Sequence, residues 1–409
     1  MSFGASETCW YCEWDPECQQ ELSLHPGCSP STCRIGDISQ VFKPKVATIA
    51  ARLRSTKGGK AVDMLQPVVK SCKGITVEVK CYAHPGKTCK LRPSELHVGG
   101  SPCTDLSTLG DGAGLEGTTC VDTLAWLGSI LVLEHTMFVS ENVFSDDLLK
   151  LIQDTVGHLY VLEFVRENAN PLKLGWPVFR NRQYLVGRHK LKTMPPSTSL
   201  SARMLKFQRQ CAMNWTVFLI ADEHEQWQEK NWAHSRGAVK TRLAARDVSN
   251  TPLHCLDFDD VLTLTEVDIL AAYNSTCPPT TCWALGQDCR NERGRISGEQ
   301  VLNTVVRNFG IVWIPQEKRW FCPTECLTAQ GFTIDRSRPT NSFCTDRVSR
   351  KRQELFHQSG NSMHVESIGG VIAHCIADIG VAASFSHKTD YDMFADISQH
   401  LVAKRCASR

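Results

Sequence analysis

The first 190 residues alternate short apolar runs with stretches of helical periodicity, and this alternation is what most constrains the fold. The strand-like runs lie at 76–83, 94–100, 136–142 and 183–187. Between them, residues 145–165 have the spacing of a helix with Ser145 as its N-cap. Strands that alternate with helices are typical of an α/β sheet, so we predict an α/β fold with a largely parallel sheet.

The alternation of strand-like and helical stretches ends after residue 190. Residues 191–318 open with the turn-rich stretch TMPPSTSLS, and motif-like sequence returns from residue 319. The composition shift therefore indicates boundaries near residues 190 and 318, and divides the chain into the segments 1–190, 191–318 and 319–409.

Composition bounds the class of protein. The 409 residues are 42% hydrophobic and 22% charged, with a net charge of +2, so a nucleic-acid site would have to be a local basic surface. The apolar stretch 123–140 is interrupted by Glu134 and His135, which argues against a membrane span. The start lacks the features of a signal peptide, and the twenty cysteines are expected to be reduced thiols of a protein that is nuclear or otherwise intracellular.

Five short motifs follow one another along the chain. They are GGSPCTDLS with Pro102 and Cys103, SENV with Glu141, FRNRQ with Arg180 and Arg182, RWFCPTECLTAQGF (319–332), and QSGNSMHV (358–365) with Asn361 and Ser362. In this order they resemble the motifs of the DNA cytosine-5 methyltransferases, and the nucleophile motif is similar to that of animal de novo enzymes. Each motif alone is unspecific, whereas five in the same order are a specific signal.

This resemblance implies an enzyme that methylates carbon 5 of cytosine, most simply in DNA. Cys103 would add as a thiolate to carbon 6, because carbon 5 is a poor nucleophile until this addition occurs. Glu141 would contact ring nitrogen 3, while Arg180 and Arg182 would donate to the base oxygen and nearby phosphates. Since the target carbon is inaccessible inside a duplex, the base would be flipped into the site.

The resemblance also implies a catalytic domain with a Rossmann-like sheet that binds S-adenosylmethionine. Residues 1–190 would form this domain and residues 319–409 would complete it, with a smaller target-recognition domain inserted at 191–318. Glu13 would hold the ribose hydroxyls, Trp14 would stack on the adenine, and Asp37 would face its amino group. The full set of predicted cofactor-binding residues is Glu13, Trp14, Asp37, Ile38, Pro102, Asn361 and Ser362.

One motif of the family is missing. It is a Phe-x-Gly-x-Gly loop about twenty residues before the acidic residue. Only twelve residues precede Glu13, so we expect a chain truncated at its N-terminus. Two alternatives therefore stay open: the same chemistry on RNA, as in the tRNA-methylating branch, and a non-catalytic methyltransferase-like nucleic-acid binder.

The remaining candidates are weaker. Residues 226–247 interleave two tryptophans with five lysines and arginines, and fit either a nucleic-acid groove or a solvated helix. The acidic run 257–260 is expected to be a solvated or capping turn. Two groups of cysteines lack paired CxxC motifs at the usual spacing, so no metal site is expected. These groups are Cys9, Cys12, Cys18, Cys28 and Cys33, and Cys277, Cys282 and Cys289.

Overall fold

The chain is seen in a computed structural model that divides it into two compact units. The structure describes residues 8–23, 28–56, 58, 60–102, 104–106, 112–290, 300–305, 310–332 and 352–383. Unit 1 comprises Met1–Ala169, Arg182–Phe207 and Gly369–Arg409, and unit 2 comprises Asn170–Asn181 and Gln208–Ile368. The segment boundaries expected from composition, at 190 and 318, remain a prediction.

Unit 1 contains the larger sheet and the helices that pack on it. Its strands are β1 (Trp10–Cys12), β2 (Cys33–Ile35), β3 (Glu78–Lys80), β4 (Thr88–Lys90), β5 (Leu96–Gly99), β6 (Met137–Asn142), β7 (Tyr160–Val165) and β8 (Gln183–His189). Its helices are α1 (Pro16–Ser23), α2 (Pro44–Arg54), α3 (Ala61–Lys70), α4 (Cys120–Leu133), α5 (Asp146–Val156), α6 (Leu200–Lys206) and, from Gly369 on, α12 (Val365–Ala383).

The sheet confirms the expected α/β fold but is mixed rather than largely parallel. Its order is β5-β6-β8-β7, in which β5 and β6 run parallel and β8 is antiparallel to both of its neighbours. A separate parallel pair joins β1 to β2. All residues of β8 are buried, as is typical of strands in a parallel sheet. The sequence therefore did not indicate that β8 runs antiparallel to its neighbours.

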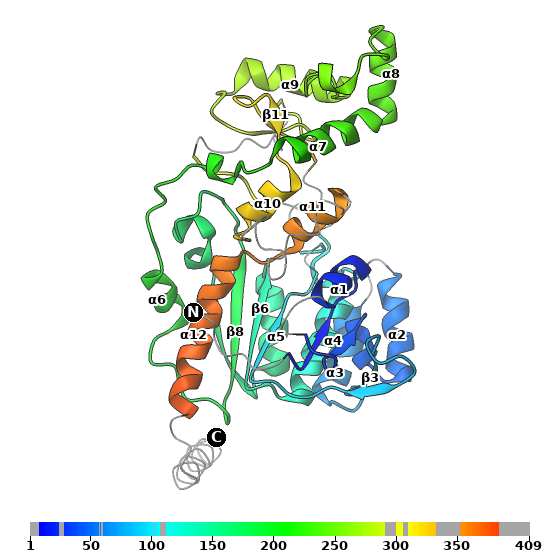
Figure 1. Cartoon of the computed structure of the whole chain (residues 1–409). Helices are drawn as coiled ribbons and strands as arrows, with labels where there is room; N and C mark the ends of the chain where they lie inside the picture. The colour runs from blue at the N-terminus through cyan, green and yellow to red at the C-terminus, as the bar shows by residue number, and fades with distance from the viewer. Residues whose placement is uncertain are drawn as a thin grey trace. The chain divides into compact units, whose positions relative to one another are not determined.

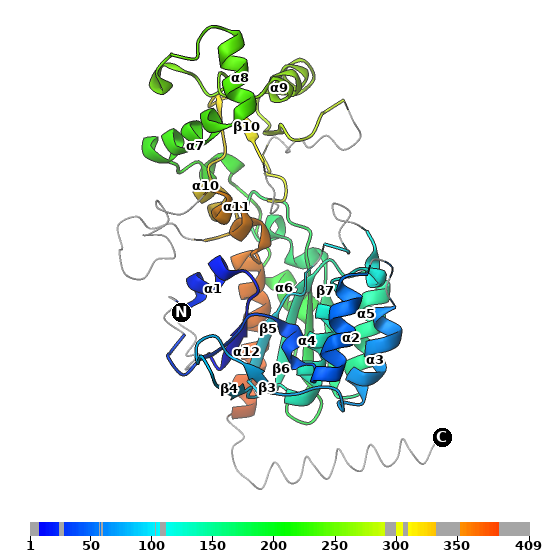
Figure 2. The same ribbon diagram turned by 90° about the vertical axis from the view of Figure 1, so that its right-hand side faces the viewer.

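Helices cover both faces of the β5–β8 sheet (Figure 1, Figure 2). α3, α4 and α5 pack on one face, and α12 lies along the other. The core on the first face is built around α4, which is buried on nearly all sides because it lies between the sheet and other helices. The predicted strands at 94–100, 136–142 and 183–187 correspond to β5, β6 and β8, so these predictions are confirmed.

The predicted helix over 145–165 is correct only in its first half. The Ser145 hydroxyl caps α5 by accepting a hydrogen bond from the backbone N–H of Leu148. The helix ends at Val156, and Gly157 terminates it before β7 begins at Tyr160. The run YVLEFV is rich in aromatic and β-branched residues, and here strand propensity outweighs an apolar spacing that also fits a helix.

A buried polar cluster ties α12 and α6 to the sheet within unit 1. The carboxylate of Glu163 on β7 accepts hydrogen bonds from Arg188 Nε at 3.0 Å and from the backbone N–H of Leu200 at 2.9 Å, and lies 3.2 Å from His374 Nε2. Burial disfavours the charged carboxylate, but these partners outweigh it and lower the pKa of Glu163 to about 2. Glu163 is therefore ionised at neutral pH.

Unit 2 combines short helices with a three-stranded sheet of order β11-β10-β9. Its elements are α7 (Glu223–Ser235), α8 (Gly237–Ala245), α9 (Leu264–Thr276), β9 (Trp283–Ala284), β10 (Val312–Ile314), β11 (Arg319–Trp320), α10 (Pro323–Ala329), α11 (Arg352–Asn361) and the start of α12. Arg319 forms a buried two-point ion pair with Glu325, at 2.8 and 3.0 Å. Both residues belong to the motif 319–332, and their ion pair stabilises unit 2.

Candidate active site

The candidate site of unit 1 lies at the carboxyl ends of the parallel strands β5 and β6. The register places Gly99 opposite Ser140, so the chain leaving β5 passes beside the end of β6. There the side-chain amide of Asn142 donates to Ser101, to its carbonyl at 3.1 Å and its hydroxyl at 2.8 Å. Two motifs whose contacting residues are 41 positions apart in sequence therefore meet, and Asn142 fixes the segment that leads to Cys103.

Cys103 itself lies outside the described residues, and Pro102 just before it is exposed. The chain beyond it is anchored by Asp105, a buried residue that sequence reasoning missed. The Asp105 carboxylate accepts from the backbone N–H of Thr119 at 2.8 Å and from its hydroxyl at 2.7 Å, just before α4. Described anchors thus stand on both sides of Cys103. Asp105 lies two residues after Cys103 in the string SPCTD, and this position is the signal that would have pointed to it.

Glu141 and Arg182 form an ion pair beside this loop. Nε of Arg182 lies 3.2 Å from Oε1 of Glu141, and the two side chains are only 17% and 12% exposed. The pairing follows from the sheet, because Asn142 lies opposite Gln183 in the antiparallel register of β6 and β8. A carboxylate and a guanidinium are thereby held in a site of low exposure, where charge interactions are stronger than in water.

Gln183 is a further positioning residue that sequence reasoning did not single out. Its side-chain oxygen accepts a hydrogen bond from the backbone N–H of Phe144 at 2.8 Å, and the residue is 3% exposed. This contact orders the chain that leaves β6 directly after Glu141 and Asn142. A buried amide at this point satisfies a backbone group that would otherwise lack a partner.

Arg180 and the motif at 360–362 are brought together within unit 2. The guanidinium is 2% exposed and donates to three backbone carbonyls: Val305 at 3.0 Å, Gly360 at 3.3 Å and Ser362 at 2.6 Å. These contacts are structural, since they hold the turn after α11. Asn361 is the exposed last residue of α11. The predicted donation of Arg180 to a substrate remains a prediction.

The predicted cofactor residues Glu13 and Asp37 follow two adjacent parallel strands. Cys12 lies opposite Ile35, so the two acids fall at the same edge of the β1–β2 pair. Glu13 accepts from the backbone N–H of Asp15 at 2.9 Å. Burial raises the pKa of its carboxyl group, and the hydrogen bond from that amide only partly offsets this.

Asp37 is held more tightly than the sequence indicated. Its two oxygens accept from the guanidinium of Arg54 at 2.7 and 2.9 Å, and the backbone N–H of Ser39 also donates to it. Arg54 bonds Asp122 on α4 as well. Burial raises the pKa of Asp37, but the hydrogen bonds from Arg54 and Ser39 outweigh it, so the pKa is lowered. Asp37 is thus an ionised residue that is already paired.

Trp14 and Ile38 occupy different surroundings at this edge. The indole of Trp14 is 73% exposed, which leaves its face open for stacking. Ile38 opens a 3₁₀ turn capped by the Asp37 carboxylate and packs partly buried against the core. The structure therefore gathers Glu13, Trp14, Asp37 and Ile38 at one edge of unit 1.

Four of the five lysines and arginines in the basic stretch 226–247 bond to other groups within unit 2. The cations with internal partners are Lys230 (Leu256 carbonyl, 2.7 Å), Arg236 (Glu266, 2.7 Å), Arg242 (carbonyls of residues 259, 260 and 262, 2.9 Å each) and Arg246 (Asp260, 2.9 Å). These contacts favour the structural interpretation of the stretch over a nucleic-acid groove. They also explain the acidic run 257–260, which ends beside the arginines of α8.

No protein-family model matches the chain, and no curated protein sequence matches it. Solved structures with a similar fold include three methyltransferases. A protein described as a DNA modification methyltransferase encoded within an E. coli prophage is 13% identical, with 91% of this chain and 92% of that chain covered and a TM-score of 0.47. The Entamoeba histolytica methyltransferase EhMeth is 10% identical over 90% and 89% of the two chains, with a TM-score of 0.47. The S. pombe methyltransferase Dnmt2 is 12% identical over 91% of each chain, with a TM-score of 0.46.

Within the described residues, no helix has the length and apolar character needed to cross a membrane.

Proposed function

We propose that this chain is an enzyme that transfers a methyl group to carbon 5 of cytosine in DNA. The observation that carries the proposal is the meeting of two motifs at the end of β5 and β6, where Asn142 holds Ser101 and Glu141 pairs with Arg182. An attacking thiol and a carboxylate for the base have to approach the same ring, and this edge brings their motifs to one place. The GGSPCTDLS form of the nucleophile motif supports DNA rather than tRNA as the substrate.

In this proposal each residue has a separate task. Cys103 adds to carbon 6 of a flipped cytosine, and the pyrimidine ring takes up the electron pair. Glu141 binds ring nitrogen 3 and favours its protonation as negative charge develops on the ring. Arg182 orients Glu141 through their ion pair, so that the carboxylate is already in position when the base binds. Asn142 and Asp105 are positioning residues, because they hold the loop rather than touch the base.

The β1–β2 edge suits S-adenosylmethionine as the methyl donor. S-adenosylmethionine supplies an activated methyl group when bound. This edge offers a carboxylate at Glu13 for hydroxyl groups and an indole at Trp14 that is 73% exposed, a fit for a ribose and a purine ring. Asp37 keeps lone pairs on each oxygen beyond its bonds to Arg54, so it can still accept from an adenine amino group.

The test is methyl transfer from labelled S-adenosylmethionine to duplex DNA and to tRNA, with the nucleoside product identified. We expect 5-methylcytosine in DNA, and a loss on the order of 10³-fold or more in Cys103→Ser. Glu141→Gln is expected to lose most of the rate while it remains folded. Cys255→Ser, which removes an exposed cysteine of unit 2, is the matched control and keeps full activity.

Two results would overturn the proposal in different ways. Transfer to tRNA alone would keep the chemistry and replace the substrate. Binding of DNA without any transfer, from a folded chain that also binds no S-adenosylmethionine, would make the protein a non-catalytic nucleic-acid binder.

A further inference from the structure

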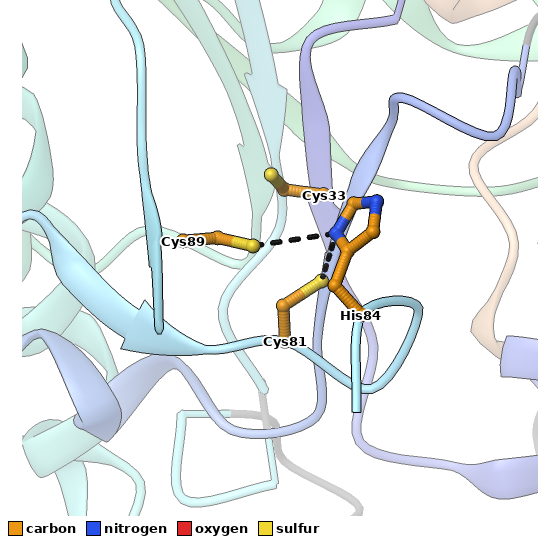
Figure 3. Close-up of side chains that lie close together, drawn as sticks. All are labelled: Cys33, Cys81, His84 and Cys89. Atoms are coloured by element: carbon orange, nitrogen blue, oxygen red, sulfur yellow. Dashed lines mark hydrogen bonds between the residues drawn. The ribbon is translucent and has the colours of Figure 1, made fainter. Parts of the chain in front are cut away.

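Four side chains of metal-binding type converge in unit 1, and none of them is a residue of the candidate active site. They are Cys33, Cys81, His84 and Cys89 (Figure 3). Cys33 comes from β2, Cys89 from β4, and Cys81 and His84 from the loop that joins β3 to β4. Their sulfur and nitrogen atoms all lie within 4.8 Å of one another. A loop and two strands have therefore been folded so that three thiols and one imidazole face a common point.

The distances fit ligands that share one tetrahedral ion. Sγ of Cys81 and Sγ of Cys89 each lie 3.3 Å from Nδ1 of His84. Zinc bonds to sulfur at about 2.3 Å and to nitrogen at about 2.0–2.1 Å, so a tetrahedral site separates these atoms by about 3.6 Å. Hydrogen bonds alone explain the cluster less well, because two thiols approach the single lone pair that Nδ1 can offer.

The surroundings of the cluster also match those of a metal site. Nε2 of His84 lies 3.0 Å from the backbone carbonyl of Pro30, so the ring donates there and turns the lone pair of Nδ1 toward the sulfurs. The backbone N–H of Arg34 donates to Sγ of Cys81 at 3.2 Å.

We propose that Cys33, Cys81, His84 and Cys89 bind one structural zinc ion. Three soft thiolates and one imidazole in tetrahedral array select zinc among the common divalent cations. No metal was expected from the sequence. The spacing C-x₂-H-x₄-C at 81–89 supplies only three ligands, and the fourth lies 48 residues before Cys81. Cys33 belonged to a group of cysteines considered there, but its partners were not.

The ion would act as a clamp between two parts of unit 1. The β3–β4 hairpin meets β2 through one backbone bond, from Tyr82 N–H to the Arg34 carbonyl at 3.0 Å, together with the contact of Arg34 to Cys81. Zinc would add four bonds across the same junction. Because β2 leads directly to Asp37, the clamp would stabilise the edge that carries Glu13 and Asp37. This inference does not depend on the proposed methyl transfer.

The experiment measures metal in the full chain, purified under reducing conditions from cells grown with zinc. Elemental analysis by inductively coupled plasma mass spectrometry is expected to find about one zinc ion per chain. Replacement of zinc by cobalt(II) is expected to give the visible bands of tetrahedral thiolate-bound cobalt. His84→Ala and Cys89→Ser are expected to lose the metal, whereas His84→Cys keeps four ligands and retains it. Cys255→Ser, outside the cluster, is the control and also retains it.

Removal of zinc by a chelator provides a readout that does not require any variant. Hydrogen exchange is expected to rise in peptides that cover 78–90 and 28–35, with little change in α5. The proposal is overturned if the wild-type chain holds no zinc and gives no cobalt bands. It is equally overturned if non-reducing peptide mapping finds Cys81 and Cys89 in a disulfide without metal, or if zinc persists in the combined His84→Ala, Cys89→Ser variant.

Discussion

Replacing Glu163 by glutamine should destabilise unit 1 through the buried cluster on β7 and β8. Glutamine keeps the shape and still accepts from the backbone N–H of Leu200, but it removes the negative charge that faces Arg188 and His374. Arg188 is 1% exposed, so its charge would remain buried beside a neutral amide. Loss of one partner of a buried pair is costly for this reason.

The magnitude follows from two independent considerations. The pKa of Glu163 is lowered from 4.5 to about 2, and each pKa unit corresponds to about 1.4 kcal/mol, which gives at most about 3 kcal/mol, because the bond from Leu200 remains in the variant. Breaking a buried ion pair typically costs about 3–5 kcal/mol. We therefore expect the free energy of unfolding of unit 1 to fall by about 3 kcal/mol.

The sign of the pH dependence is fixed as well. Because the folded pKa lies below the unfolded one, this stabilisation is fully present above pH 4.5 and is lost as the pH falls toward 2. The assay is urea unfolding by circular dichroism, with hydrogen exchange of β8 peptides assigning the change to unit 1. Glu167→Gln, an exposed glutamate of the same unit, is the control. A loss no larger than that of the control, at neutral pH, would refute the reasoning.

Three further predictions concern unit 1. Burial lowers the pKa of His135 to about 3, so its contribution to stability is full above pH 6.5 and falls at lower pH. His135→Asn can still accept a hydrogen bond from Ser94, and its melting temperature should fall less steeply between pH 7 and 5 than that of the wild type. Equal slopes for the two proteins would contradict this. Gly187→Ala places a Cβ 2.1 Å from the ring of Phe138 and should lower stability by about 1–3 kcal/mol in urea unfolding; an unchanged midpoint would contradict the packing. Trp14→Ala should weaken S-adenosylmethionine binding about tenfold in calorimetry without a change in melting temperature, because the indole is 73% exposed; unaltered affinity would remove Trp14 from the site.

The sequence predicted most reliably the elements whose signals are local. Runs with alternating or continuous apolar residues gave β5, β6 and β8, and Ser145 marked the start of α5. The extension of that helix to residue 165 was wrong, because YVLEFV fits both periods and only the packing of β7 against β8 decides between them.

The candidate site could be predicted as residue types but not as pairs. Motif order indicated Glu141 and Arg182, yet their ion pair depends on the register of β6 and β8, which no local pattern encodes. The bond of Arg54 to Asp37 and the cluster of Cys33, Cys81, His84 and Cys89 were missed for the same reason. Each joins side chains that are distant in sequence, and their proximity follows only from the folded chain.

The most direct test of the central claim is covalent capture of DNA by Cys103. A duplex that contains 5-fluorocytosine is incubated with the chain and S-adenosylmethionine, and the products are separated under denaturing conditions. Fluorine cannot leave carbon 5 as a proton does, so an attacking cysteine stays bonded to carbon 6. The account predicts a denaturant-stable protein–DNA complex whose crosslinked peptide contains Cys103 and which is absent in Cys103→Ser. A folded chain that binds both S-adenosylmethionine and DNA yet forms no complex, or one crosslinked through another residue, would contradict it.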